Sequence, residues 1–146
     1  MNAPAQARWE ARQAAEEALP NAECDNCTRC ADRCTESVPM TQEEYARIAR
    51  FLGRRPVPPE PSRPSGEMAA PCRFLAAGSR LCLIYPVRPL ACRLFGLTPW
   101  WPCPASRFEP KLTDADRLLA LYCELPRAPF EEWRRAASRP KGTTDG

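Results

Sequence analysis

The chain of 146 residues contains no histidine, and this absence removes several classes of chemistry. Without histidine there is no Ser-His-Asp or Cys-His catalytic arrangement, no mixed Cys/His zinc finger, no 2-His-1-carboxylate iron site and no His-ligated haem. Glycine is also scarce, with six residues and no glycine-rich run, which excludes a P-loop and a Rossmann turn. Any metal in this protein must therefore be held by sulfur, with carboxylate as the remaining donor.

Long apolar runs are missing as well. The longest candidate, residues 81–85, has the size of a strand and falls far short of the roughly 18 apolar residues of a membrane span. Residues 1–19 read as an Ala/Glu/Arg helix without the apolar region of a secretory signal. We therefore expect a cytoplasmic protein without membrane contact, in which grouped cysteines bind metal more often than they form disulfides.

What the sequence has in excess is cysteine, with nine residues, of which eight fall into two groups of four. The first group is a C-x2-C-x2-C-x3-C run, the spacing of [4Fe-4S] ligation in ferredoxins: Cys24, Cys27, Cys30 and Cys34. The second group has spacings of 10, 10 and 11 residues: Cys72, Cys82, Cys92 and Cys103. We predict that at least four of these eight bind metal. Cys123 stands alone. It is either a small buried side chain or a reactive thiol, and the sequence does not decide between these two alternatives.

Arginine dominates the basic residues, since the chain has only two lysines. Between Glu67 and Glu109 there are five arginines and no acidic residue. A divalent ion or a [4Fe-4S] core with four thiolates is anionic, and arginines beside it stabilise the thiolate form. We therefore predict a role beside the cofactor for three of these arginines: Arg73, Arg88 and Arg93. The alternative, a nucleic-acid surface formed with Trp100 and Trp101, is less favoured.

The order of segments predicts a small α+β domain organised by metal, with several helices, few short strands and proline-rich loops. We expect residues 1–20 to form an N-terminal helical arm, residues 21–138 the metal-binding domain, and residues 139–146 a disordered tail. Six of the eighteen residues in 54–71 are proline, so this segment is predicted to be an extended surface loop.

Local signals place the secondary structure within this order. Thr41-Gln42-Glu43-Glu44 forms a capping box that predicts the start of a helix, and Gly53 predicts its end. Two apolar runs at 72–76 and 81–85, separated by a polar turn, predict a β-hairpin. The other predicted helices cover 5–19, a turn or two from Pro89 to Gly96, the stretch from Thr113 to Pro126, and 130–139.

Beyond these patterns, the chain resembles the YkgJ-type cysteine-cluster family, also described as the CxxCxxCC zinc- or iron-chelating domain. Three pieces carry the resemblance: the C-x2-C-x2-C run, the segment Val38-Pro39-Met40-Thr41 leading into a helix, and Pro71–Leu75 followed by Cys82–Phe95. The resemblance implies a set of cluster cysteines: Cys24, Cys27, Cys30, Cys72, Cys82 and Cys92. The family motif closes with two adjacent cysteines, whereas Ala31 follows Cys30 here. Either Cys34 supplies the missing sulfur or one site has lost a ligand.

The predicted function is the binding of an iron-sulfur cluster or zinc by thiolates, with a role in electron transfer, sensing or metal handling. The alternative is a structural zinc module that acts as a protein- or nucleic-acid-interaction domain with an unknown protein partner. Catalysis is not favoured, because the acidic pairs at Asp114/Asp116 and Glu131/Glu132 are better explained as helix-start charges. Metal identity, the number of sites and the grouping of the cysteines stay open.

Overall fold

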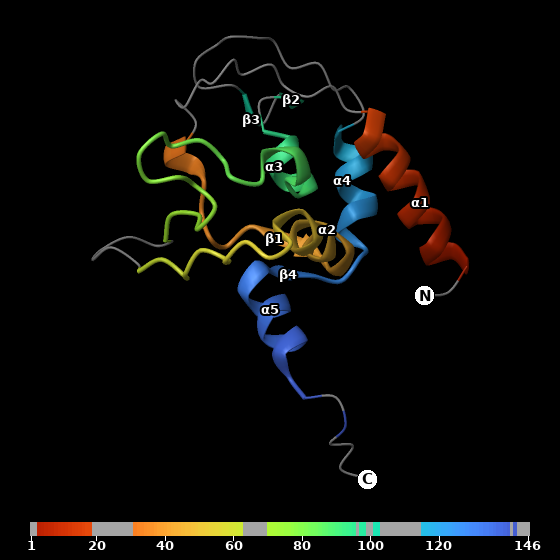
Figure 1. The fold of residues 1–146 in the computed structure, drawn as a ribbon. Coiled ribbons are helices and arrows are strands. Elements are labelled where there is room, and N and C mark those ends of the chain that lie inside the picture. Colours follow the sequence, from red (N-terminus) through yellow and green to blue (C-terminus); the bar gives the residue numbers. More distant parts are fainter. Residues whose placement is uncertain are drawn as a thin grey trace.

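A computed structural model describes residues 3–18, 31–62, 70–95, 97–98, 101–102, 115–140 and 142. Within these residues it contains five α-helices: α1 (Ala3–Ala18), α2 (Gln42–Leu52), α3 (Leu90–Arg93), α4 (Ala115–Cys123) and α5 (Phe130–Ser138). Two 3-10 turns, η1 (Ala31–Arg33) and η2 (Tyr85–Val87), lie between them. The strands are short: β1 (Pro39–Thr41), β2 (Leu97–Thr98), β3 (Trp101–Pro102) and β4 (Arg127–Pro129). The predicted α+β class is confirmed (Figure 1).

The four strands form two antiparallel pairs, β1 with β4 and β2 with β3. In the first pair Met40 lies opposite Ala128, and prolines lie opposite each other at one end, Pro39 against Pro129. Proline is tolerated there because, among the described residues, each strand has a partner on one side only. The β1–β4 pairing was not predicted, and it joins the segment before α2 to the segment before α5 (Figure 1).

Helix α2 occupies the centre of the fold, and its predicted capping box is confirmed (Figure 1). The Glu44 N–H donates to Thr41 Oγ1 at 3.2 Å, and the Thr41 N–H donates to Glu44 Oε2 at 2.8 Å. The helix ends at the predicted Gly53, whose φ of 57° lies in the region that favours glycine. Ile48 and Leu52 are buried on its inner face.

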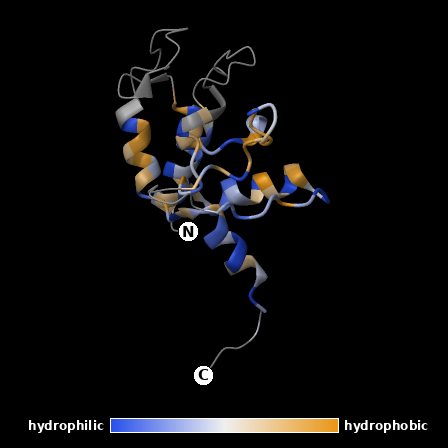
Figure 2. Ribbon diagram, turned by 90° about the vertical axis from the view of Figure 1, so that its left-hand side faces the viewer, coloured by the Kyte–Doolittle hydropathy of each residue, from blue (hydrophilic) through white to orange (hydrophobic). Residues whose placement is uncertain are grey.

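The apolar core packs around α2. Its residues come from segments that precede and follow Cys72 and Cys82 in the sequence. Its buried members are Met40, Ile48, Leu52, Phe74, Ile84 and Phe130. The rings of Phe74 and Phe130 pack edge to face at 5.0 Å, and the Trp133 Nε1–H donates to Met40 O at 2.8 Å. Beyond this anchorage α5 projects from the fold, and most of its length is hydrophilic (Figure 2). Cys72 and Cys82 pack against the same core.

Helix α1 fills most of the predicted N-terminal arm, and it packs against α4 (Figure 1). Arg8 Nε and Glu124 Oε2 form an ion pair at 2.6 Å. The side chain of Arg12 is completely buried, with its guanidinium 3.7 Å from the centre of the Trp9 ring and 5.3 Å from that of Tyr122. The helix is therefore joined to the body by a buried charged residue in addition to its apolar contacts.

The predicted β-hairpin over 72–85 is confirmed only in part, because the two runs pair through two hydrogen bonds, from the Ala76 N–H to Leu81 O at 2.9 Å and from the Leu83 N–H to Phe74 O at 2.8 Å. The structure has one isolated antiparallel bridge, between Leu75 and Cys82, and two reverse turns in place of strands. The Cys72 carbonyl accepts from the Leu75 N–H at 3.1 Å, and the Cys82 carbonyl accepts from the Tyr85 N–H at 3.4 Å. These turns use the backbone groups that a longer strand ladder would need.

Other predicted boundaries are met in part. Helix α3 begins after Pro89 as expected and ends at Arg93, whereas the predicted stop at Gly96 lies outside the described residues, as do Thr113 and Asp114 before α4. The described part of the proline-rich loop, 54–62 and 70–71, contains no helix or named strand. Most of the predicted tail, 139–146, also lies outside the description. Among the described residues, no helix is both long and apolar enough to span a membrane.

Candidate metal centre

Five cysteines lie in the described part of the chain, and all carry free thiols. Four of them are half-buried: Cys34 after η1, Cys72 and Cys82 at the starts of the two turns, and Cys92 in α3. Cys123, at the end of α4, is exposed. The other predicted ligands, Cys24, Cys27, Cys30 and Cys103, lie outside the described residues.

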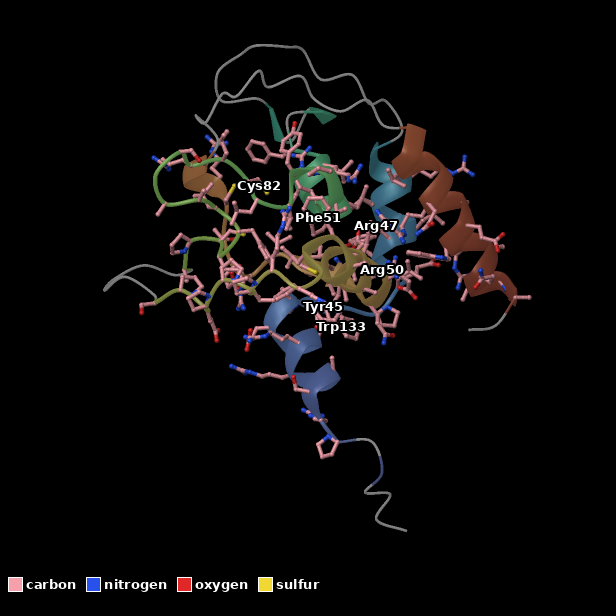
Figure 3. All side chains as sticks on the ribbon, viewed as in Figure 1. Tyr45, Arg47, Arg50, Phe51, Cys82 and Trp133 are labelled. Atoms are coloured by element: carbon pink, nitrogen blue, oxygen red, sulfur yellow. The ribbon has the colours of Figure 1, made fainter. Side chains whose placement is uncertain are left out.

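The four half-buried thiols share one neighbourhood. In each of their six pairings the two sulfurs are close enough for their charges to interact. Backbone contacts bring the segments together, since the Cys72 N–H donates to Cys34 O at 3.1 Å and Leu75 bridges to Cys82. Cys82 lies in the loop that passes beside η1 (Figure 3). Cys34 of the first predicted group therefore lies within electrostatic range of Cys72, Cys82 and Cys92 of the second.

The two turns present their cysteines in the same way. The N–H of Phe74 donates to the Cys72 sulfur, and the N–H of Ile84 donates to the Cys82 sulfur, in each case from two residues further along. A hydrogen bond to sulfur favours the thiolate, which is the form that binds metal. Such bonds also tune thiolate-held clusters. The pair of turns is thus a repeated local geometry for a thiolate ligand.

Burial acts in the opposite direction on these thiols. It raises the pKa of Cys34 and Cys82, and it raises the pKa of Cys72 and Cys92 to about 12. The charge of Arg88 lowers the pKa of Cys34, Cys82 and Cys92, but by less than burial raises it. To be deprotonated, these sulfurs would need more positive charge than the arginine supplies, and a metal cation is one source of such charge.

The three predicted arginines have different positions. Arg88 faces the thiols, with its Nε–H donating to Tyr85 O at 3.1 Å and its guanidinium 3.8 Å from the centre of the Tyr85 ring. Arg93 donates to two backbone carbonyls, Arg88 O and Pro86 O, both at 2.9 Å, and so holds the backbone that carries Arg88.

Arg73 belongs to a separate ion-pair network. Its buried guanidinium pairs with Glu36 and, at 2.9 Å, with Glu131, and its backbone N–H also donates to Glu36. Because Arg73 follows Cys72 and Glu36 lies two residues after Cys34, this network holds two cysteine segments together.

Sequence reasoning missed the contribution of Glu44 to this region. Its Oε1 accepts from the Leu90 N–H at 2.8 Å, at the start of the helix that carries Cys92. The capping box predicted the local bond to Thr41, but no local pattern reveals an acceptor for a backbone group 46 residues away.

A protein-family model matches residues 23–124, a span that contains all nine cysteines. Its description is "CxxCxxCC: Putative zinc- or iron-chelating domain". The chain belongs to this CxxCxxCC family. The resemblance seen in the sequence is confirmed at the level of the family, and the narrower YkgJ type stays a prediction. Neither the curated proteins nor the solved structures gave a match.

The CxxCxxCC domain does not complete a ligand set from the described residues alone. Among them, no group of three or more His, Cys, Asp or Glu side chains converges closely enough to hold a metal ion. The electrostatic coupling of the four thiols extends over longer distances than metal coordination, so both observations hold. The donors themselves fit zinc or iron, because thiols supported by N–H groups and an arginine suit these metals.

Proposed function

We propose that this CxxCxxCC domain binds iron, as a [4Fe-4S] cluster, or zinc through cysteine thiolates that include Cys34, Cys72, Cys82 and Cys92. The observation that carries the proposal is that these four thiols, from three separate stretches of chain, lie within electrostatic range of one another. A bound [4Fe-4S] cluster would supply one-electron chemistry. This chemistry suits electron transfer, sensing or metal handling in the cytoplasm, where thiols stay reduced.

The geometry of η1 supports Cys34 as the substitute for the adjacent cysteine that the family motif places at Ala31. The Cys34 N–H donates to Ala31 O at 3.1 Å, which is the i to i+3 bond of a 3-10 turn. Side chains three residues apart in such a turn lie on the same face. Cys34 can thus present its sulfur on the side where a cysteine at 31 would point. We propose Cys24, Cys27, Cys30 and Cys103 as the remaining ligands.

Within this site the protein's own groups would stabilise the thiolates. The N–H groups of Phe74 and Ile84 would donate to two ligand sulfurs, and Arg88 would add positive charge. Arg93 would hold the Arg88 backbone in place through its two carbonyl bonds.

A structural zinc module is the second candidate. The observation that favours it is the scarcity of regular secondary structure around Cys72 and Cys82. Residues 70–89, which carry two of the thiols, contain only turns, one 3-10 turn and isolated bridges. A metal cross-link would stabilise such a segment, since structural zinc contributes about 10–16 kcal/mol in small zinc domains. In this case the domain would act through its surface on a protein or nucleic-acid partner.

The test is anaerobic purification followed by elemental analysis, sulfide determination and a visible spectrum. Iron with sulfide supports the cluster, whereas zinc alone supports the structural module. Cys72→Ser, Cys82→Ser and Cys92→Ser should each lose most of the bound metal. The matched control is Cys123→Ser, which removes an exposed thiol and should keep the wild-type metal content. Unchanged metal content in all three variants would refute thiolate ligation at this site.

A further inference from the structure

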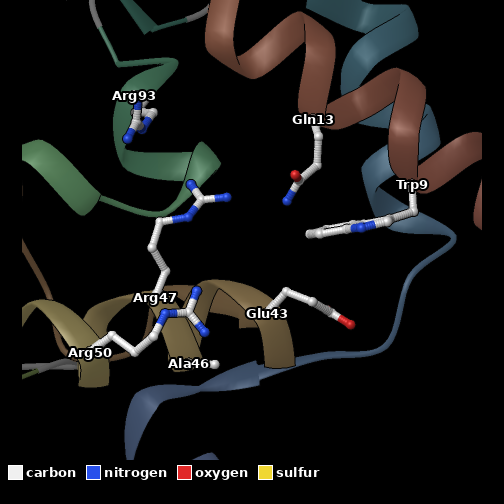
Figure 4. Close-up of a pocket in the computed structure, with 7 residues that line it drawn as sticks. All are labelled: Trp9, Gln13, Glu43, Ala46, Arg47, Arg50 and Arg93. Atoms are coloured by element: carbon white, nitrogen blue, oxygen red, sulfur yellow. The ribbon is translucent and has the colours of Figure 1, made fainter.

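A second polar site lies between α1, α2 and α3, in a cleft of about 450 Å³ (Figure 4). The side chains that matter for its chemistry are Trp9 and Gln13 from α1, Glu43, Arg47 and Arg50 from α2, and Arg93 from α3. None of the four described thiols of the candidate metal centre lines it. The cleft therefore needs its own explanation.

Positive charge dominates the described lining, with three guanidinium groups against one carboxylate. The Arg47 guanidinium and the Gln13 amide extend into the cleft from opposite sides (Figure 4). The Glu43 carboxylate points toward the space beneath Trp9, away from Arg47 (Figure 4). Guanidinium groups bind planar and tetrahedral oxyanions through paired N–H bonds, and an amide N–H adds a further donor.

The walls of the cleft are held in place by contacts behind them. The guanidinium of the buried Arg12 stacks on Trp9 at 3.7 Å, and Arg93 is anchored by its bonds to the carbonyls of Pro86 and Arg88. A site whose side chains are already fixed loses less entropy when it binds a ligand. This arrangement favours a specific ligand over a diffuse ion atmosphere.

We propose that this cleft binds a phosphate group, either as inorganic phosphate or as part of a small phosphate monoester. The described lining carries a net charge of +2, which matches a phosphate dianion better than a single carboxylate. The indole of Trp9 offers an apolar wall for the organic part of a monoester. The proposal does not depend on the metal, because none of the four proposed metal ligands that the structure describes lines the cleft.

The test is calorimetric titration of the purified protein with inorganic phosphate, phenyl phosphate and benzoate, at constant ionic strength kept with chloride. Arg47→Gln and Arg50→Gln should each weaken phosphate binding about tenfold, the lower range for a hydrogen bond to a charged group. Glu43→Gln should tighten it severalfold, because it removes the carboxylate from the described lining. The matched control is Arg54→Gln, an exposed arginine just beyond α2, which should bind as the wild type does.

Comparison of the three titrated ligands distinguishes inorganic phosphate from a phosphate monoester as the occupant of the cleft. Saturable binding of inorganic phosphate supports the free ion, whereas preference for phenyl phosphate, lost in Trp9→Ala, supports a monoester. Benzoate binding as tightly as phenyl phosphate would overturn the assignment of a phosphate site. Unsaturable binding, or equal weakening by Arg50→Gln and Arg54→Gln, would overturn the site itself. Metal content measured on the same samples should be equal in all variants, so this result is read separately from that of the metal centre.

Discussion

Two buried polar regions of this protein differ in how their charge is compensated. The first surrounds Glu44, whose residue is 1% exposed. Its carboxylate accepts from the Thr41 N–H at 2.8 Å, the Tyr122 hydroxyl at 2.6 Å and the Leu90 N–H at 2.8 Å. Arg12 Nη1 lies 3.7 Å from Glu44 Oε1, the oxygen that also accepts from the Leu90 N–H. Burial and the charge of Glu44 raise the pKa of Tyr122, so its hydroxyl stays protonated and donates.

The second region is the group of thiols at Cys34, Cys72, Cys82 and Cys92. Here burial raises the pKa of every member, and the described groups that favour the thiolates are two backbone N–H groups and nearby arginine charge. The comparison is instructive because both regions join distant parts of the chain. Protein atoms compensate the carboxylate, whereas burial keeps the four thiols protonated, and under the proposed function a metal cation would supply the charge that their thiolate forms lack.

The largest effect is expected from removing the negative charge of Glu44, the buried carboxylate that protein atoms compensate. Glu44→Gln removes the negative charge 3.7 Å from Arg12 Nη1, while the Arg12 guanidinium stays charged and buried. Breaking one member of a buried ion pair costs about 3–5 kcal/mol. The free energy of unfolding, measured by urea denaturation, should fall by this amount.

The control for this change is the neighbouring Glu43→Gln, which neutralises an exposed glutamate in the same helical turn. It should stay within about 0.5 kcal/mol of the wild type, as surface substitutions do. Equal losses of unfolding free energy in the two variants would show that the Glu44 network contributes no more to stability than an exposed glutamate does. This result would contradict the description of Glu44 as a compensated buried charge.

The next largest effect is expected in the thiol region, where the charge of Arg88 partly offsets the rise in thiol pKa that burial causes. Arg88→Gln should lower metal affinity about 10–100-fold, the range for groups that support metal ligands without binding the metal. Arg80→Gln should have a smaller effect, because the charge of Arg80 lowers the pKa of Cys34 alone among the four thiols. Competition with a chelator at fixed pH measures both. A larger loss with Arg80→Gln than with Arg88→Gln would contradict the assignment of Arg88.

The sequence predicted the parts of this fold that depend on near neighbours. The capping box of α2 is an example, because Thr41 and Glu44 are three residues apart and recognise each other within one helical turn. The C-x2-C spacing likewise predicted a thiolate site, and the family match supports that class of protein. Proline at the start of α3 and glycine at the end of α2 were read correctly for the same reason.

The remaining features depend on contacts that no local pattern contains. Tyr122 reaches Glu44 across 78 residues, and Leu90 reaches it across 46. The apolar runs around Cys72 and Cys82 suit strands and buried turns equally well, so the hairpin prediction gave the antiparallel pairing of the two runs but not the turns that replace most of both strands. Arg88 faces the thiols as expected, but Arg73 does not, because its direction is decided by acids distant in the sequence, Glu36 and Glu131.

The smallest of these effects concerns the Arg73 network, which borders the thiols but is compensated by protein atoms. Burial acts to raise the pKa of Glu131, but the hydrogen bond and charge of Arg73 and the charge of Arg134 outweigh it and lower that pKa below its ordinary 4.5. Glu131→Gln should cost about 1–2 kcal/mol at pH 7, less than a full buried pair because Arg73 keeps Glu36.

The pH dependence of this cost has a definite sign. A carboxyl whose pKa is lower in the folded state stabilises the fold above its unfolded value, and this stabilisation is lost as the pH falls through the folded value. The difference between wild type and Glu131→Gln in urea denaturation should therefore be full at pH 7 and shrink below about pH 4. Glu132→Gln, at an exposed neighbouring position, should show neither effect. Metal content should stay at the wild-type level, because this network supports the cysteine segments without supplying a ligand. A difference that persists unchanged at low pH would show that Glu131 acts through packing, and a loss of metal would place this network with the thiols in the region that needs a cation.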